Sequence, residues 1–319
     1  MDMKFLIYLQ KLREAFPAPV TQLFMLISDF VVSPGLIALP CVVYWCLDKR
    51  KGAHILFSFG FGAVLNNLIK ICVCMPRPWL RDTRITPHES ALETATGYSF
   101  PSGHTQSAAS VFGSLGWSYR ERFGWAVPVA AVLTAVVAFS RCLLGVHAPQ
   151  DVIVGMALGV FCVWLAGQLV TWADAGEGRD TAVTIVACVL TAAACVFVAV
   201  KPYPAVAGLS AEDRALMALD TYKALGMFPG AFLGWWAERR YVRFEARCDL
   251  RRGMARIALG IAVVVAFRYA LAWPVSLIGN EAAFEFVKNF LTTVAAVVVA
   301  PLAFTNLEAR IAEASRTGE

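Results

Sequence analysis

Long apolar runs dominate this chain and leave few folds open to it. A helix needs about 20 predominantly apolar residues to cross a bilayer, and nine such runs follow one another along the 319 residues. They lie near 22–47, 53–74, 100–118, 124–146, 150–173, 180–201, 222–237, 254–277 and 282–305. Only 16% of the residues are charged, against roughly 25% in ordinary soluble domains. The sequence therefore predicts an all-α, polytopic transmembrane helical bundle with about nine spans.

The first twenty residues differ from the runs that follow. Leu6, Leu9, Leu12 and Phe16 recur at helical spacing among charged residues, which is typical of an amphipathic helix lying in the membrane interface. Because apolar and charged residues alternate up to Phe16, we expect no cleavable signal peptide. Residues 1–20 are therefore predicted to form an interfacial amphipathic helix.

Basic residues gather between the apolar runs and give the chain its net charge of +5. This distribution is typical of the cytoplasmic loops of membrane proteins and not of a nucleic-acid-binding surface. Three connections are rich in Lys and Arg: 49–51, 120–122 and 239–252. If nine spans alternate across the membrane, these connections share one side, which is then cytoplasmic. The N-terminus is accordingly predicted to lie outside and the C-terminus inside.

Three polar clusters interrupt the apolar sequence. They are KICVCMPRP (70–78), SFPSGH (99–104) and a segment from Ser140-Arg141 through His147 to Asp151. They lie at the end of the second run, the start of the third and the end of the fourth. The predicted topology places these three ends on one face, so the clusters should form one site at the outer boundary of the bilayer.

The cations of these clusters suit a phosphate group. Lys70 follows sixteen residues that carry no charge, and charged side chains at membrane depth normally face protein or water. Arg77 and Arg141 offer forked donors that match phosphate oxygens. The alternatives are that Lys70 reaches the interface along its own stem and that the arginines anchor the ends of their spans.

Ser102 and Gly103 precede a long apolar helix. Backbone N–H groups at such an N-terminus can bind an anion, with the helix dipole behind them. The alternative for Ser102 is a helix N-cap, and both roles can hold together.

Two of the four histidines, His104 and His147, fall within the polar clusters. Paired imidazoles beside a bound phosphate suit nucleophilic and acid–base catalysis. The sequence has no cluster of carboxylates spaced to hold Mg²⁺, and its nine cysteines show no metal-ligand spacing with histidine. We therefore expect no metal and no other cofactor. The cysteines are expected to be small apolar residues of the interior, with a Cys72–Cys142 disulfide as the alternative.

Taken together, the patterns K-x6-RP, PSGH and SR-x5-H-x3-D resemble the signature of the type 2 phosphatidic acid phosphatase superfamily, complete and in order over about 80 residues. The resemblance implies that His147 is the nucleophile, which forms a phosphohistidine, and that Asp151 bonds its other ring nitrogen. It also implies that His104 is the general acid and base. The phosphate-binding residues that it implies are Lys70, Arg77, Ser102, Gly103 and Arg141.

The resemblance also implies a six-span core, predicted here at residues 21–201, so that residues 202–319 form a C-terminal extension of three spans. Asp220, Lys223, Glu238 and Tyr241 follow a pattern that resembles the C-terminal region of some bacterial members. Gly155 and Gly159 form a G-x-x-x-G pair on the predicted fifth span. We expect this pair to allow close helix packing within the chain, in preference to a dimer contact.

The expected function is that of an integral-membrane enzyme which hydrolyses a lipid phosphate or pyrophosphate, without a metal, on the extracytoplasmic face of the cell membrane. Its expected partners are a phosphorylated lipid and the membrane, and no nucleic acid. One alternative is a phosphatase for a soluble ester such as glucose 6-phosphate. Another is a non-catalytic lipid transporter or scaffold. A haloperoxidase is disfavoured because the relatives of that kind are soluble.

Overall fold

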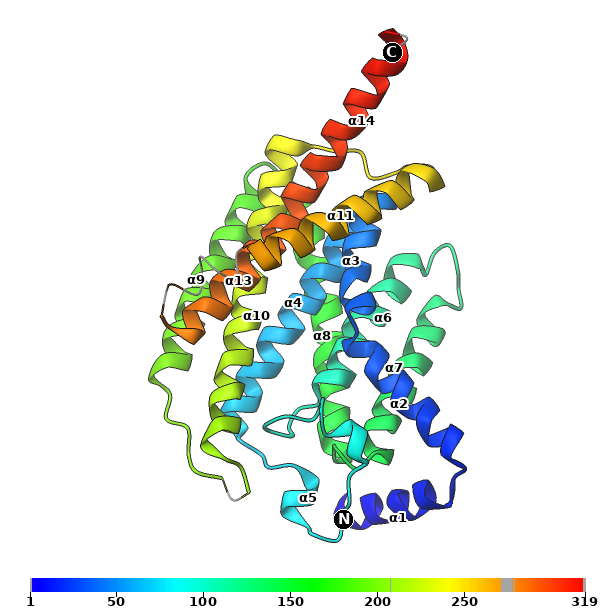
Figure 1. Cartoon of the computed structure of the whole chain (residues 1–319), viewed down its shortest axis with the longest axis vertical. Helices are drawn as coiled ribbons and strands as arrows, with labels where there is room; N and C mark the ends of the chain where they lie inside the picture. The colour runs from blue at the N-terminus through cyan, green and yellow to red at the C-terminus, as the bar shows by residue number, and fades with distance from the viewer. Residues whose placement is uncertain (1, 207, 271–276, 278, 318–319) are drawn as a thin grey trace. The chain divides into compact units, whose positions relative to one another are not determined.

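Helices form almost the whole structure, and no strand occurs among the residues described (Figure 1). The structure is a computed structural model that describes residues 2–206, 208–270, 277 and 279–317. Its helices are α1 (Asp2–Ala15), α2 (Ala18–Val32), α3 (Pro34–Cys46), α4 (Lys49–Val73), α5 (Pro78–Arg81), η1 (Glu89–Ala91), α6 (Gly103–Tyr119), α7 (Ala126–Leu143), α8 (Pro149–Asp174), α9 (Arg179–Val200), α10 (Ala211–Ala237), η2 (Glu238–Val242), α11 (Leu250–Ala270), α13 (Glu281–Val294), η3 (Ala295–Val299) and α14 (Ala300–Thr317). The predicted all-α class is confirmed.

Six of the nine predicted spans coincide with helices in the described residues that are long and apolar enough to cross a membrane. These six lie at Lys49–Arg81, Ala126–Leu143, Pro149–Asp174, Arg179–Val200, Leu250–Ala270 and Glu281–Arg316. The chain is therefore a multi-pass membrane protein. Residues 271–276 of the predicted eighth span lie outside the described residues.

The other three predicted spans are helical but fall short of these criteria for three different reasons. The first run is divided at Ser33 into α2 and α3, of 15 and 13 residues. Helix α6 has 17 residues, which span only about 26 Å at 1.5 Å per residue. Helix α10 begins at Ala211, well before the predicted Tyr222, and carries charged residues through its first half. By these criteria the described residues show six of the about nine predicted spans, because hydropathy alone did not detect the helix break, the shortness of α6 or the polar start of α10.

The described helices divide into two compact units that are interleaved along the chain. The first comprises Met1–Ala38, Ser58–Gly167 and Val198–Thr221. The second comprises Leu39–Phe57, Gln168–Phe197 and Tyr222–Glu319. All three polar clusters belong to the first unit.

Within the first unit, α8 packs against α6 at two glycines. A side chain added at Gly155 would place its Cβ 2.6 Å from the carbonyl oxygen of Ser102, and one at Gly159 would lie 2.4 Å from the Cβ of Ala109. Contacts this short exclude any larger residue without a shift of backbone. The predicted close packing of the G-x-x-x-G pair within one chain is confirmed, and it fixes the start of α6 against α8.

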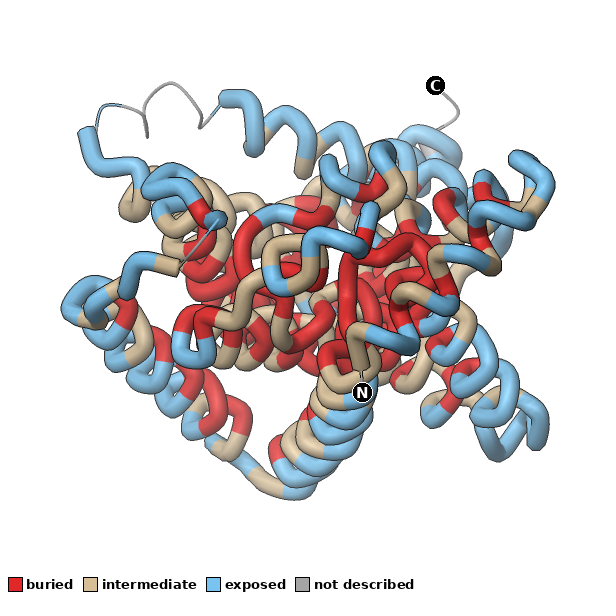
Figure 2. Tube along the Cα trace, turned by 90° about the horizontal axis from the view of Figure 1, so that it is seen from below, coloured by how far each residue is buried: buried red, intermediate tan, exposed pale blue. Residues whose placement is uncertain are grey.

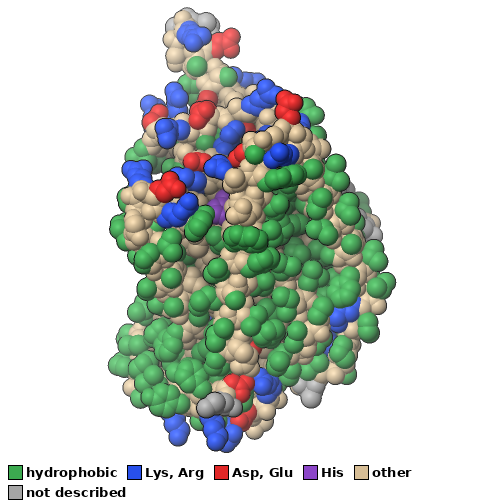
Figure 3. Space-filling view, turned by 180° about the vertical axis from the view of Figure 1, so that it is seen from behind, with side chains coloured by type: hydrophobic (Ala, Val, Ile, Leu, Met, Phe, Trp, Pro, Cys, Tyr) green, Lys and Arg blue, Asp and Glu red, His purple; other side chains and the backbone are tan. Residues whose placement is uncertain are grey.

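Large apolar side chains lie exposed along the spans. On α9, Ile185, Val189 and Val196 are each more than half exposed, and in Figure 2 buried and exposed stretches alternate along single helices. The face drawn in Figure 3 is mostly hydrophobic, with the charged side chains gathered in groups. Soluble proteins rarely expose continuous apolar surface of this extent, so these faces are suited to contact with lipid chains.

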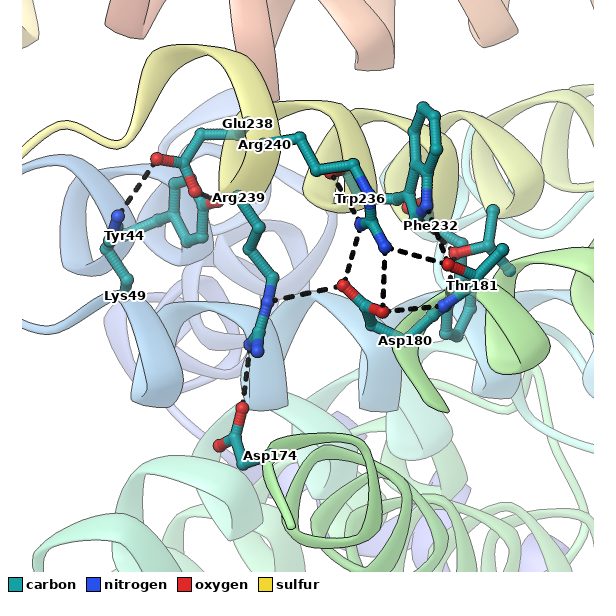
Figure 4. Close-up of polar contacts among 11 residues, drawn as sticks. Tyr44, Lys49, Asp174, Asp180, Thr181, Phe232, Trp236, Glu238, Arg239 and Arg240 are labelled. Atoms are coloured by element: carbon teal, nitrogen blue, oxygen red, sulfur yellow. Dashed lines mark hydrogen bonds and ion pairs between the residues drawn. The ribbon is translucent and has the colours of Figure 1, made fainter. Parts of the chain in front are cut away.

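Charged residues of the second unit form a paired network where α10 passes into the π-helix η2 (Figure 4). The buried carboxylate of Glu238 accepts hydrogen bonds from the Tyr44 hydroxyl and Lys49 Nζ, both at 2.9 Å. Arg240 donates to both oxygens of Asp180, at 2.8 and 3.2 Å. Two of the basic residues that mark the predicted cytoplasmic side, Lys49 and Arg240, are thus engaged within the protein.

We predict that Gly159→Leu destabilises the protein, because the new side chain meets Ala109 and the backbone of α6. Overpacking of this kind costs about 1–3 kcal/mol or more. The measurement is unfolding of the purified protein in detergent, followed by circular dichroism. Gly124→Leu is the matched control, since a Cβ at Gly124 meets nothing within 4 Å. Equal stability of the two variants would contradict the packing described.

Candidate active site

The long connection between α4 and α6 frames the site. Lys70 lies in the last turn of α4, and its Nζ donates to the carbonyl oxygen of Tyr98 at 2.9 Å. Helix α4 ends at Val73, and Cys74 follows with a left-handed backbone (φ 51°). The chain then returns so that Ser99 N–H donates to the carbonyl oxygen of Met75 at 2.8 Å. These bonds hold the first and second polar clusters side by side.

Arg77 is held by backbone carbonyls. Its guanidinium donates to the oxygens of Thr96 at 2.7 Å, Gly97 at 3.1 Å and Val146 at 3.1 Å. The side chain is only 3% exposed. A buried cation is tolerated when it is hydrogen-bonded in this way, so the arginine is fixed in place before any anion arrives.

His147 stands between Arg77 and Asp151. Arg77 Nη1 lies 3.0 Å from His147 Nε2, and Asp151 Oδ2 lies 3.3 Å from His147 Nδ1. A guanidinium has donors and no acceptor, so Nε2 must accept, and the proton of the neutral ring is on Nδ1, facing the carboxylate. Burial, followed by the positive charge of Arg77, lowers the pKa of His147 well below its ordinary value of 6.5. The ring is therefore neutral near pH 7, with a lone pair on Nε2.

Asp151 is positioned by several donors. Its Oδ2 accepts from the Ser99 hydroxyl at 2.5 Å and from the Ala148 N–H at 2.9 Å, besides facing His147. The residue is completely buried at the start of α8. The sequence predicted the pairing of Asp151 with His147 but assigned no role to Ser99. The only signal for that role was its place beside the PSGH motif.

A cavity of about 220 Å³ lies beside these groups. Of the expected site residues, Lys70, Arg77, Gly103, His104 and His147 line it. His104 Nε2 is buried and has no hydrogen-bond partner within the described part of the chain. The cavity thus joins two imidazoles, two cations and the first residue of α6.

Ser102 and Arg141 are not among the described residues that line the cavity. The Ser102 N–H donates to the Asp151 carbonyl oxygen at 2.9 Å, while its hydroxyl accepts from Thr105 N–H at 3.4 Å. Its amide is therefore occupied, and the structure gives Ser102 the N-cap role that the sequence left open as an alternative.

Arg141 is fully buried near the end of α7. One of its terminal nitrogens donates to Ser28 Oγ at 2.6 Å and lies 3.4 Å from Thr94 Oγ1. Its Nε and other terminal nitrogen have no partner among the described residues. Ser28, on α2, was not predicted from the sequence, because no motif marks a single serine far from the clusters.

Neither metal ligation nor a disulfide enters the site. No three His, Cys, Asp or Glu side chains in the described ranges come together as a group that could hold a metal ion. All nine cysteines, Cys72 and Cys142 included, are free thiols. Burial varies among them, from the buried Cys142 to the exposed Cys72, so the expectation that they lie in the interior holds only in part.

Comparison with known families agrees with this arrangement of motifs. The description "PAP2 superfamily" matches residues 51–175, and "PAP2 superfamily phosphatase, transmembrane extension" matches residues 222–314. The two matches together cover more than half of the chain. The chain belongs to the PAP2 superfamily. The first match contains all three polar clusters, and the second begins inside α10.

Individual relatives match part of their own length. Lipid phosphate phosphatase delta of Arabidopsis thaliana is 28% identical over 50% of this chain and 39% of its own. Phosphatidylglycerophosphatase B of Escherichia coli is 30% identical over 39% of this chain and 66% of its own. Decaprenylphosphoryl-5-phosphoribose phosphatase of Mycobacterium tuberculosis is 40% identical over 28% and 45%. The chain thus spans from about two fifths to about two thirds of these relatives.

Proposed function

We propose that this protein is an integral-membrane phosphatase that hydrolyses phosphate or pyrophosphate monoesters of lipids through a phosphohistidine, without a metal ion. One observation carries the proposal, namely two imidazole nitrogens with different roles at one cavity. His147 Nε2 accepts from Arg77 and so carries a lone pair, whereas His104 lines the same cavity and its Nε2 has no hydrogen-bond partner among the described residues. That pair is what a nucleophile and a separate general acid require.

In the first step, the lone pair of His147 Nε2 attacks phosphorus and the bond from phosphorus to the ester oxygen breaks. The leaving oxygen takes a proton from His104, whose protonated form is favoured by the negative charge of the bound phosphate. The Asp151 carboxylate accepts the Nδ1 hydrogen of His147 and stabilises the positive charge that the ring acquires. The products of this step are a phosphohistidine and the lipid alcohol, or the lipid monophosphate when the substrate is a pyrophosphate.

In the second step, a water molecule attacks the phosphohistidine. His104, now neutral, takes a proton from this water, and the phosphorus–nitrogen bond breaks to release inorganic phosphate. His147 returns to its neutral form and His104 to its protonated form, so the cycle closes without an external reagent.

The cations beside the cavity suit the charge that develops in both steps. Negative charge grows on the equatorial oxygens of the five-coordinate phosphorus, and fixed donors in a water-poor site stabilise it strongly. Lys70, Arg77 and the N-terminus of α6 at Gly103 line the cavity. Arg141 does not line the cavity, and two of its nitrogens have no partner among the described residues. These positive groups and the absence of a metal-ligand cluster among the described residues support a metal-free reaction.

A lipid substrate is favoured by where the site lies and by the names of the relatives. The clusters adjoin spans whose outer faces are apolar, so a lipid could keep its tail in the bilayer while its head enters the cavity. Extraction of a chain into water costs about 0.8 kcal/mol per CH₂. The named relatives are phosphatases of lipid phosphates.

The first test concerns the nucleophile. His147→Ala should abolish both turnover and covalent incorporation of labelled phosphate, because no lone pair replaces Nε2. His104→Ala should slow turnover by about 10²–10⁴-fold, and less with a nitrophenyl leaving group, which needs no proton. His88→Ala, outside the cavity, should behave as the parent protein. Label that persists in the His147 variant and maps to another residue would refute the assignment.

The second test concerns the substrate class. With EDTA present, purified protein in detergent should hydrolyse a long-chain alkyl phosphate with kcat/KM at least about tenfold above that for glucose 6-phosphate, because the tail contributes apolar burial. Phosphate release would be measured for both esters under identical conditions. Equal values would sink the lipid assignment. Activity that returns only with Mg²⁺ after chelation would sink the metal-free reaction.

The third test concerns the side of the membrane, which we infer from the basic connections to be extracytoplasmic. Thr83 is exposed in the connection between α5 and η1, near the site, and Arg122 is exposed beyond the far end of α6. In a cysteine-depleted background, a cysteine at Thr83 should react with an impermeant thiol reagent on intact cells. One at Arg122 should react only after lysis. The reverse pattern would place the site in the cytoplasmic leaflet.

A further inference from the structure

Helix α10 contributes a wall to the catalytic cavity, and neither of the two family matches, at residues 51–175 and 222–314, includes the residues of that wall. Met217 and Asp220, three residues apart and therefore on one helix face, both line the cavity. Met217 is buried against Gly97, where its sulfur leaves no room for a side chain. The carbonyl oxygen of Gly97 accepts from Arg77 Nε. This chain of contacts links the N-terminal part of α10, at Met217, to Arg77.

Asp220 is chemically unlike the rest of the cavity lining. Among the described residues that line the cavity it is the only carboxylate, and Lys70, Arg77 and both catalytic imidazoles line the same space. It interacts electrostatically with Lys70. A carboxylate repels a phosphate dianion, so by itself it weakens the binding of the group that the cations attract. Its presence is favourable when the ligand also carries a positive charge or a hydrogen-bond donor.

A neutral acceptor shares the cavity with Asp220. Asn67 donates one amide hydrogen to the Ala63 carbonyl oxygen at 2.9 Å, which leaves its Oδ1 as an acceptor, beside one remaining N–H. The cavity volume of about 220 Å³ is below the roughly 300–1,000 Å³ of pockets that enclose whole drug-sized ligands. That space admits a phosphoryl group and a few further atoms, so the acceptors can reach only groups close to the ester oxygen.

We propose that Asp220 is a specificity-determining residue, which binds an ammonium or hydroxyl group carried within a few bonds of the ester oxygen of the substrate. Asn67 assists as a second acceptor. The inference rests on the proposed phosphatase function and narrows its substrate class. It favours lipid phosphates whose head carries such a donor over esters of a plain hydrocarbon alcohol.

The competing role for Asp220 is that of a counter-ion, which positions Lys70 and touches no substrate. The two roles differ in what a neutral replacement does. Loss of a counter-ion impairs every phosphate ester alike. Loss of a donor-binding group impairs only substrates with the donor and relieves the repulsion felt by the others.

The test compares full-length parent protein with Asp220→Asn on sphinganine 1-phosphate, its N-acetyl derivative and dodecyl phosphate. The first carries an ammonium group, the second a neutral amide in its place, and the third no donor. The parent protein should prefer the ammonium ester over dodecyl phosphate. Asp220→Asn should lower kcat/KM for the ammonium ester by about tenfold or more and raise it for dodecyl phosphate. The N-acetyl ester should change less than the ammonium ester.

Glu212→Gln is the matched control, on the same helix and outside the cavity, and it should leave the ratio of the three substrates unchanged. An equal fall of all three substrates in Asp220→Asn would overturn the specificity role in favour of the counter-ion. A parent protein that does not discriminate would overturn it as well. No hydrolysis of any ester by the parent protein would instead overturn the proposed function and the inference with it.

Discussion

Asp151 is the residue on which the arrangement of the site depends. Its carboxylate faces His147 and accepts from Ser99 and Ala148, while its carbonyl oxygen accepts the amide of Ser102. A single buried residue at the start of α8 therefore ties the second polar cluster to the third. A buried carboxylate is unfavourable unless it is hydrogen-bonded. Each donor to the Asp151 carboxylate offsets part of that cost and helps to fix its orientation toward His147.

The glycine contacts between α6 and α8 reinforce the same connection. Gly155 brings α8 against the Ser102 carbonyl, one turn after Asp151 receives the Ser102 amide. Two helices that meet backbone to backbone leave little room for rearrangement, because packed interiors have few voids. The two imidazoles that line the cavity, one at the start of α6 and one just before α8, are consequently held by backbone as much as by side chains.

The three motifs made most of this site predictable from the sequence. Lys70, Arg77, His104, His147 and Asp151 lie together because spacing and topology require the ends of their helices to meet. The sequence did not show which of the expected residues line the cavity. The Ser102 amide donates to Asp151, and Arg141 donates to Ser28 and does not line the cavity. Neither contact could be predicted, because both depend on packing between segments that are distant in the sequence. Asp220 stood out only as part of a pattern, because its place in the cavity depends on an early start of α10 that hydropathy obscured.

The hydrogen bonds of Arg77 to three backbone carbonyl oxygens bear on the order of the proposed catalytic steps. A guanidinium has five N–H groups, and within the described part of the chain three serve carbonyl oxygens and one serves His147 Nε2. On the proposed pathway, Nε2 ceases to be an acceptor once it carries the phosphoryl group. The Arg77 N–H that had donated to Nε2 can then donate to an oxygen of the phosphoryl group. One N–H of Arg77 would thus change its acceptor from His147 Nε2 to a phosphoryl oxygen of the intermediate. Its bonds to the three carbonyl oxygens would keep the side chain in place.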